Sequence, residues 1–523
     1  MSEQRDTAAP VRTDPDRRLR VLFFLHSLGY VRFFDPVLRE LLARGHRVHL
    51  IFERDDHDEN ERIWLGEMER VNGFSWSFTR TLKYDTWRHF AMRIRSANDA
   101  ARFFAPPFRD SGYLFVRAEH RAPDWFRRLA GGRLGHSERG VALLARWLGA
   151  IESAIPNSRA LQRELASHDP DVFVLCPHLM PGMRHSDYLV AARALGVPAV
   201  LCVASWDNLS SKQLLHEVPD RVIVWNETQV QEAVELHAVP RERIVVTGAQ
   251  SFDQWFGWTP RPREEFCERV GLDAARPYAL YVGGSLFPGE TTEAEWAPRW
   301  LEEVRAEPRL REVGVLFRPH PNRGEEWSGV SLAGQDNVAV WPPLHTEMPL
   351  DSEARADFFD SIHHSFAVFG LNTSAMIESS VVGRPVHTML VPEFEASQTG
   401  VFHFDYLLRV GGGLLRVADT FDELREQLCQ ALDGSDGEAE ERRRRFLEAF
   451  IRPHGLERPA TPVVADAIEA VAGLGPVERA RMPLRYWPLR APLAAYVRLK
   501  PLGRRARFKA RLILESRRAK AEE

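Results

Sequence analysis

The sequence predicts an α/β protein of two Rossmann-like, doubly wound domains that face each other across a cleft. Short apolar runs alternate with stretches of helical periodicity along most of the chain, and this alternation is the pattern of parallel βαβ units. It occurs in two series, and the proline-containing stretch Trp255–Pro262 separates them. Two parallel sheets joined by such a linker bind a ligand in the crevice between them.

The first series begins with the apolar run Arg20–Leu25, which predicts a buried strand. An apolar periodicity over 33–42 predicts a helix that Gly45 closes, and Val48–Phe52 predicts the second strand. The pattern returns after Asp171. Further strands are expected at Val172–Cys176, Ala199–Val203, Arg221–Trp225 and Ile244–Val246, with helices at Ser186–Leu195 and 227–236.

The second series repeats the same alternation. Its expected strands are Tyr278–Val282, Val313–Phe317, Val338–Trp341, Phe366–Phe369 and Val386–Leu390. Helices are expected near 293–306, 353–363 and 374–382, and then near 421–433 and 436–451.

These patterns divide the chain into two domains with added segments. The expected parts are a disordered leader (1–18), a first domain (19–254), a second domain (265–455), a closing helix (456–478) and a basic tail (479–523). Within the first domain, 54–168 is rich in arginine and aromatic residues and predicts a mostly helical insertion. Its arginines are either solvated, or they form a surface for an anionic or lipid-linked acceptor.

Composition excludes several classes of protein. The chain has 523 residues, 44% hydrophobic and 27% charged, which is typical of a folded globular protein. Its net charge of −4 argues against a nucleic-acid partner for the chain as a whole. Four scattered cysteines make a disulfide framework or a zinc site improbable. We see no signal peptide and no membrane-spanning run, so we expect a cytoplasmic protein.

The tail differs from the rest of the chain in charge. From Arg479 to Glu523 there are fourteen Lys and Arg and three Glu, a local charge of +11, so the remainder carries −15. A helix near 503–520 would place Phe508, Leu512 and Ile513 opposite its arginines. Apolar burial combined with basic charge suits the surface of an anionic membrane. A disordered or domain-clasping tail is the alternative.

Common nucleotide and hydrolase motifs are absent. There is no Walker A loop, GxGxxG, GxSxG, HExxH or CxxC in the sequence, which argues against P-loop kinases, common dehydrogenases, α/β-hydrolases and zincins. The candidate chemistry therefore lies in loops that follow predicted strands.

Two loops of the second series are suited to phosphate. Arg318-Pro319-His320-Pro321 directly follows a strand, and its prolines hold the guanidinium and the imidazole in place. In the second loop, Asn372, Thr373 or Ser374 can cap a helix whose free amides and dipole attract an anion. Glu378 lies one turn into that helix and can accept hydrogen bonds from ribose hydroxyls. A structural His320, or a plain cap with a solvated Glu378, is the alternative.

Other loops give weaker signals. In Gly283-Gly284-Ser285 the small residues allow backbone amides, and Ser285, to approach a phosphate. The loop around Gly400 carries His403. In the first series His26 with Gly29, His178 and Asp207 each follow predicted strands. An acceptor hydroxyl needs a base, so His26, His178 and Asp207 are the catalytic candidates, although each can also be structural.

The motifs RPHPN, GLNTSAMIE and GRPV resemble those of GT-B glycosyltransferases. Within that group the likeness points to bacterial capsule and envelope transferases related to CDP-glycerol glycerophosphotransferases. This resemblance implies that Arg318, His320, Thr373 and Ser374 contact donor phosphate. Glu378 and the following Gly383-Arg384-Pro385-Val386 also resemble the donor segment of UDP-N-acetylglucosamine 2-epimerases. The resemblance covers roughly 20–52 and 170–455.

From these observations we expect a metal-independent transferase without a cofactor, because the donor half lacks Asp-x-Asp. The expected donor is a nucleotide-sugar or CDP-polyol. The expected acceptor is a glycan or a lipid-linked hydroxyl compound used in envelope polysaccharide synthesis, at the inner face of the membrane. The alternatives are an NDP-sugar 2-epimerase and a non-catalytic nucleotide-sugar-binding scaffold at the membrane surface.

Overall fold

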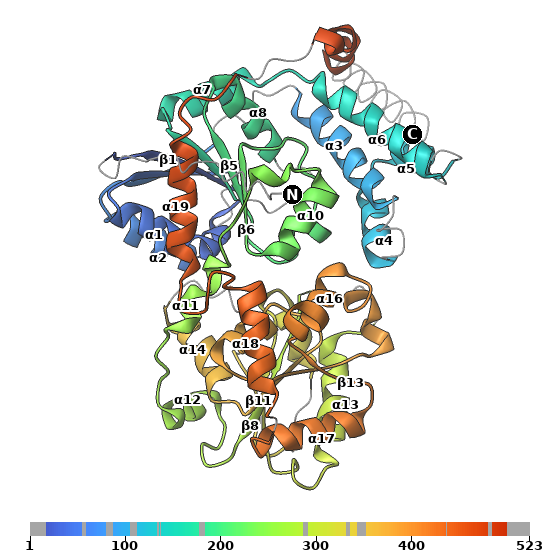
Figure 1. Cartoon of the computed structure of the whole chain (residues 1–523). Helices are drawn as coiled ribbons and strands as arrows, with labels where there is room; N and C mark the ends of the chain where they lie inside the picture. Colours follow the sequence, from blue (N-terminus) through green and yellow to red (C-terminus); the bar gives the residue numbers. More distant parts are fainter. Residues whose placement is uncertain are drawn as a thin grey trace, which may run out of the picture.

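The computed structural model confirms an α/β protein with two parallel sheets, one in each of two stacked domains (Figure 1). The described residues are 17–54, 59–79, 87–104, 112–132, 135, 137–176, 184–285, 291–330, 335–342, 352–435, 437–479 and 484–498. The expected helix near 503–520 lies outside these residues, as does most of the leader.

The first domain is built on a seven-stranded parallel sheet of order β3-β2-β1-β4-β5-β6-β7. Its strands are β1 (Arg20–Leu25), β2 (Arg47–Phe52), β3 (Phe74–Phe78), β4 (Val172–Leu175), β5 (Ala199–Cys202), β6 (Arg221–Val224) and β7 (Ile244–Val246). Val21 pairs with Val48 on one side and with Val172 on the other. The central strands are apolar throughout because helices cover both faces of a parallel sheet.

Helices on the two faces complete this domain. They are α1 (Asp35–Ala43), α2 (Glu59–Met68), α7 (Arg159–His168), α8 (His185–Leu195), α9 (Asn208–Ser211) and α10 (Glu227–His237). Helix α8 ends as expected at Gly196, whose φ of +77° suits a residue without a Cβ. Strand β3 was missed within 54–168 although its sequence FSWSF alternates between aromatic and serine residues, because the run has only five residues and none of them is fully buried.

A helical arm projects from the first domain between β3 and α7 (Figure 1). We use this name for α3 (Arg88–Phe103), α4 (Gly112–Arg121), α5 (Asp124–Ala130) and α6 (Glu138–Ser153). Ala97, Phe126 and Leu148 belong to its own small core. The His216 side chain, 1% exposed on a loop of the first domain, contacts Asp99 of α3 and Glu152 of α6 at 2.9 and 3.0 Å. This ionic contact fixes the arm to the sheet domain.

The second domain has a six-stranded parallel sheet of order β10-β9-β8-β11-β12-β13. Its strands are β8 (Tyr278–Val282), β9 (Gly314–Arg318), β10 (Val338–Val340), β11 (Ala367–Gly370), β12 (Val386–Met389) and β13 (Arg416–Ala418). Its helices are α12 (Arg263–Val270), α13 (Glu293–Arg305), α14 (Ser352–His363), α15 (Ala375–Val382), α16 (Phe402–Arg409), α17 (Phe421–Leu432) and α18 (Ala439–Phe450).

The chain crosses between the domains twice. It first crosses after α11 (Asp253–Phe256), and it returns through α19 (Ala460–Ala472), which packs on α1. Asp253 holds both crossings together, because its carboxylate accepts hydrogen bonds from Arg452 at 2.7 Å and from the Thr461 amide at 2.7 Å. In the described ranges no helix is long and apolar enough to span a bilayer.

Candidate functional site

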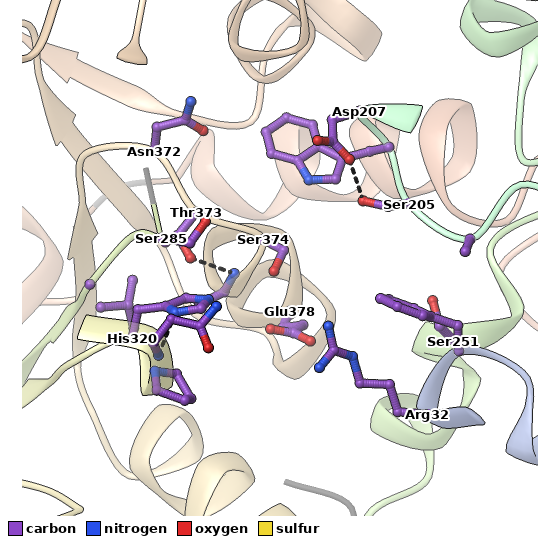
Figure 2. Close-up of a pocket in the computed structure, with 18 of the residues that line it drawn as sticks. Arg32, Ser205, Asp207, Ser251, Ser285, His320, Asn372, Thr373, Ser374 and Glu378 are labelled. Atoms are coloured by element: carbon purple, nitrogen blue, oxygen red, sulfur yellow. Dashed lines mark hydrogen bonds between the residues drawn. The ribbon is translucent and has the colours of Figure 1, made fainter. Parts of the chain in front are cut away.

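A cavity of about 780 Å³ lies between the two domains and the helical arm. Loops at the carboxyl ends of strands in both sheets line it, where doubly wound folds bind ligands. Figure 2 shows part of this lining. Of the predicted residues, the lining includes Asp207, Ser285, Arg318, His320, Asn372, Thr373, Ser374, Glu378 and His403.

His320 follows β9 and begins the 3-10 helix η6 (Pro321–Gly329). Its Nδ1 accepts a hydrogen bond from the Asn322 amide at 3.2 Å. Burial, together with the charges of Arg32 and Arg323, lowers the pKa of His320 to about 4. The ring is therefore neutral at pH 7, and because Nδ1 is an acceptor its proton sits on Nε2. His320 thus supplies one N–H donor at the cavity wall.

Arg318 ends β9 and is a fixed cation in the same wall. Its side chain is buried, and Nη1 donates to Ser361 Oγ at 2.8 Å. The guanidinium also lies 5.1 Å from the centre of the Phe358 ring. Burial lowers the pKa of Arg318 to about 10, so it keeps its charge at neutral pH.

The loop after β11 directs the amino end of α15 toward the cavity. Ser374 occupies the cap position but makes no capping hydrogen bond with its exposed side chain. Thr373 Oγ1 accepts from the Ala375 amide at 3.4 Å, and the Asn372 side chain donates to the Ser397 carbonyl. Thr373, one of the three expected caps, therefore bonds the first amide of the helix. The Met376 and Ile377 amides donate to the Thr373 and Ser374 carbonyls, so these amides are not free as expected, and Ser374 lines the cavity.

Glu378 and Arg32 face each other from the two domains (Figure 2). Burial raises the pKa of Glu378 to about 7, although Arg32 and Arg318 oppose this shift. Arg32 belongs to η1 (Leu28–Phe33), and burial lowers its pKa. Sequence reasoning missed Arg32. Its position in the segment that follows β1, at the carboxyl edge of the sheet, was the available signal.

The Gly283-Gly284 amides are used within the protein, contrary to expectation. The Gly283 amide donates to the Arg318 carbonyl at 2.9 Å, and the Gly284 amide donates to Glu293 Oε2 at 2.9 Å. A Cβ on Gly283 would lie 3.0 Å from the His320 backbone nitrogen. Gly283 therefore permits close packing of β8 against the His320 loop, and in the described structure Gly283 lines the cavity whereas Gly284 does not.

Asp207 is held as an ion in the first-domain wall. Lys212 Nζ lies 3.0 Å from its Oδ2, and Ser205 Oγ donates to its Oδ1 at 2.7 Å. Burial opposes ionisation, but Lys212, His403 and the hydrogen bonds keep the pKa of Asp207 far below its ordinary value. This carboxylate is therefore a weak proton acceptor, and its geometry positions Lys212.

His403 of α16 lies beside this group. Its ring makes an edge contact with Trp206, with centroids 4.7 Å apart. Burial lowers the pKa of His403 to about 4, so the ring is neutral. Its Nδ1 is buried and has no hydrogen-bond partner among the residues that the structure describes.

Two of the remaining predicted residues lie outside the cavity lining. His26 Nδ1 pairs with Glu53 at 3.0 Å, and Gly29 packs so that a Cβ there would meet Glu61 at 2.7 Å. Neither His26 nor Gly29 is part of the lining formed by the described residues. His178 lies outside the described residues.

No group of three or more His, Cys, Asp and Glu side chains that could hold a metal ion occurs in the described parts of the chain. Sequence reasoning also missed Arg117 and Arg121 of α4, which reach the cavity from the helical arm. Lys212 was missed as well.

No protein-family model matches the sequence, and no curated protein matches it either. Solved structures are similar in fold. A putative UDP-N-acetylglucosamine 2-epimerase from Listeria monocytogenes has a TM-score of 0.50 at 12% identity, covering 89% of this chain and 99% of its own. A glycosyltransferase from Rickettsia africae has a TM-score of 0.47 at 10% identity, covering 87% and 99%. The likeness to the Listeria structure shows a GT-B-like two-domain fold.

Proposed function

We propose that this protein is a glycosyltransferase of the GT-B type. It would transfer a sugar or polyol-phosphate unit from a nucleotide-activated donor to a hydroxyl group of a glycan or lipid-linked acceptor. One observation carries the proposal: the His320 N–H, the Arg318 and Arg32 cations and the amino end of α15 converge on one cavity. We call these groups the phosphate cradle, because N–H donors and cations in this combination bind a diphosphate.

The cradle also fits the chemistry of transfer. When the bond from the donor to its leaving phosphate breaks, negative charge grows on the phosphate oxygens. Preorganised donors and cations stabilise that charge most strongly where water is excluded. His320 and Arg318 would hold the phosphates from the second domain, and Arg32 would contact them from the first. The acceptor would enter from the first domain and the helical arm.

An NDP-sugar 2-epimerase is the second candidate, and Glu378 is the observation in its favour. A buried carboxyl with a pKa of about 7 can exchange a proton at neutral pH, as epimerisation requires. A scaffold that binds nucleotide-sugar without turnover remains the non-enzymatic alternative.

We also propose that the helical arm docks on an anionic membrane. Exposed apolar side chains occur on α6 and on the segment 484–498, whose η9 (Leu484–Tyr486) contacts α6. This segment lies beyond the end of the arm that is far from the second domain (Figure 1). This membrane patch comprises Leu143, Trp147, Leu484, Trp487 and Leu489. Arg485 and Arg490 lie within it, and apolar burial combined with basic charge is what interfacial binding needs.

A nucleotide screen tests the donor site. Thermal unfolding of the full chain would be measured with UDP, CDP, CMP, GDP and ADP. A bound ligand stabilises the fold by about 2.7 kcal/mol at a hundredfold excess over Kd. We expect one base to stabilise the wild type and His320→Ala to lose the effect, with His454→Ala at an exposed site as the control. If the nucleotide stabilises His320→Ala as much as the wild type, the assignment of His320 to the phosphate cradle is wrong.

Incubation with the matching nucleotide-sugar then separates the two enzymes. A transferase releases nucleotide in proportion to added acceptor, whereas an epimerase changes the sugar without one. Binding without either product would favour the scaffold.

A further inference from the structure

Helix α4 of the helical arm brings two arginines to the cavity. Arg117 and Arg121 are four residues apart, so they lie on the same face of the helix, and both belong to the lining. Arg117 donates a hydrogen bond to the Ser211 carbonyl, which fixes its guanidinium beside α9. Arg121 is exposed toward solvent at the end of α4.

The position of α4 is set by packing on both domains. Its Leu114 is fully buried in a core that includes Trp206 of the first domain and Val401 of the second. The helix also contacts η7 (Pro392–Ser397) of the second domain. The two arginines therefore occupy a defined place in the cavity wall, on an element separate from the loop that carries His320 and Arg318.

Lys212 adds a third cation to this wall. Asp207 offsets its charge at 3.0 Å, and Asp207 is the one carboxylate of the first domain among the described lining residues. Three cations and one anion leave this side of the cavity positive. The region attracts negative charge in its own right, apart from the cations around His320.

His403 supplies an independent sign that a ligand completes this region. Its side chain is 8% exposed, it lines the cavity, and its Nδ1 has no partner among the described residues. The pKa of His403 is raised by the charge of Asp207 and lowered by the charges of Lys212 and Arg117. His403 therefore lies within the same cluster. A buried ring nitrogen without a hydrogen bond is costly. Nδ1 is closed off from the cavity in this structure, so a turn of the ring would bring it to a ligand oxygen.

We propose that Arg117, Arg121, Lys212 and His403 form an oxyanion subsite that selects an acceptor carrying a phosphate or carboxylate group. This inference rests on the proposed function and refines it, because it gives the acceptor its chemical class. The helical arm then serves as the specificity element of the enzyme. Arg121 is the most suitable position for a test, since its side chain is exposed at the end of α4.

The test measures binding by calorimetry on the full chain without nucleotide. The probes are glycerol 3-phosphate, glucuronate and, as the neutral reference, glucose. We expect both anionic probes to bind at least about tenfold more tightly than glucose, and Arg121→Gln to remove most of that difference. Arg121→Lys should retain most of it. Arg146→Gln, at an exposed site on α6 of the same arm, is the matched control and should behave as wild type.

Two further variants locate the probe. His403→Ala should weaken the anionic probes, whereas His320→Ala should leave their affinity within about twofold, since it belongs to the other wall. Loss of probe binding in His320→Ala but not in Arg121→Gln would place the anion at the phosphate cradle and overturn the inference. Equal binding of glucuronate and glucose would overturn it as well.

The proposed function fails separately from this inference. The proposed function is tested by the thermal-unfolding screen, which measures nucleotide binding, and Arg121→Gln should not change that binding. Nucleotide binding without preference for anionic probes would leave the transferase proposal standing and remove the oxyanion subsite. The ratio of glycerol 3-phosphate to glucuronate affinity would show whether phosphate or carboxylate is preferred.

Discussion

Arg32 of the first domain and Glu378 of the second face each other across the cavity (Figure 2). Burial disfavours the charged form of both side chains. Their mutual attraction opposes this, because Glu378 raises the pKa of Arg32 and Arg32 lowers the pKa of Glu378. A carboxyl group that is half protonated near pH 7 balances Arg32 only in part. An anionic ligand placed between them would complete the charge balance, which makes this pair a sensitive reporter of donor binding.

Replacing Arg32 should weaken nucleotide binding. We expect Arg32→Gln to lower the affinity for the stabilising nucleotide by about tenfold, because one charge-assisted hydrogen bond to phosphate is lost. Titration calorimetry measures this. Arg47→Gln, an exposed arginine at the start of β2, is the control. Equal losses in both variants would argue that only net charge matters.

Nucleotide binding should depend on the ionisation of Glu378. Above its pKa of about 7 the carboxylate repels phosphate, so affinity should be highest below pH 7 and fall toward pH 8.5. Glu378→Gln should bind with the same affinity at both ends of this range. Calorimetry at pH 6 and pH 8.5 distinguishes the two proteins, and a wild-type affinity that does not change with pH would contradict the prediction.

Glu232 should make stability depend on pH. It lies in α10 and accepts a hydrogen bond from Tyr406 of α16, across the domain boundary. Burial raises its pKa from 4.5 to about 7. Its contribution is therefore complete below pH 4.5 and is lost as pH rises through 7, by up to about 3 kcal/mol.

Glu232→Gln keeps an acceptor for Tyr406 without the charge. It should be more stable than the wild type at pH 8 and similar to it at pH 5. Urea unfolding at the two pH values checks this expectation, and Glu235→Gln in the same helix is the control. A wild-type advantage at pH 8 would show that the carboxylate is tolerated when ionised.

The helical arm should detach when its ionic contact is removed. Burial opposes the charge of His216, but Glu152 and Asp99 raise its pKa to about 10. The ring is a cation at neutral pH and stabilises the arm until pH rises through that value. His216→Ala leaves two buried carboxylates short of a partner, at a cost of about 3–5 kcal/mol.

Limited proteolysis detects the detachment of the helical arm directly. Cleavage within 88–153 should appear in His216→Ala under conditions that leave the wild type intact. His168→Ala, on the first domain away from the arm, should not be cleaved there. An uncleaved His216→Ala protein would mean that the apolar core of the arm suffices to hold it.

Membrane binding should depend on Trp487. We expect the full chain to sediment with vesicles containing anionic lipid and not with neutral ones, since basic residues next to apolar ones need both forces. Trp487→Ala should bind several-fold more weakly. Ile63→Ala, an exposed apolar residue of α2, is the matched control. Equal binding to neutral vesicles would contradict a role for charge.

Local pattern predicted most of the sheets and the second-domain site. β8 and β11 are runs of buried apolar residues, and the loops after β9 and β11 carry His320 and Thr373 at the edge where ligands bind. Strand β3 was missed although FSWSF alternates strictly, because the run has only five residues and none of them is fully buried. Asp207 was identified as a cavity residue, but its pairing with Lys212 could not be read from the sequence.

The sequence by itself determined the two parallel sheets apart from the edge strand β3, and the wall of the cleft formed by the second domain. Both depend on residues close together in the chain, through apolar periodicity and through loops that directly follow strands. Only the tertiary structure decided which groups meet across the cavity. The Arg32–Glu378 pair, and the approach of Arg117 to Lys212 and His403, depend on the packing of separate elements. Burial there sets each pKa, and burial is a property of the assembled fold.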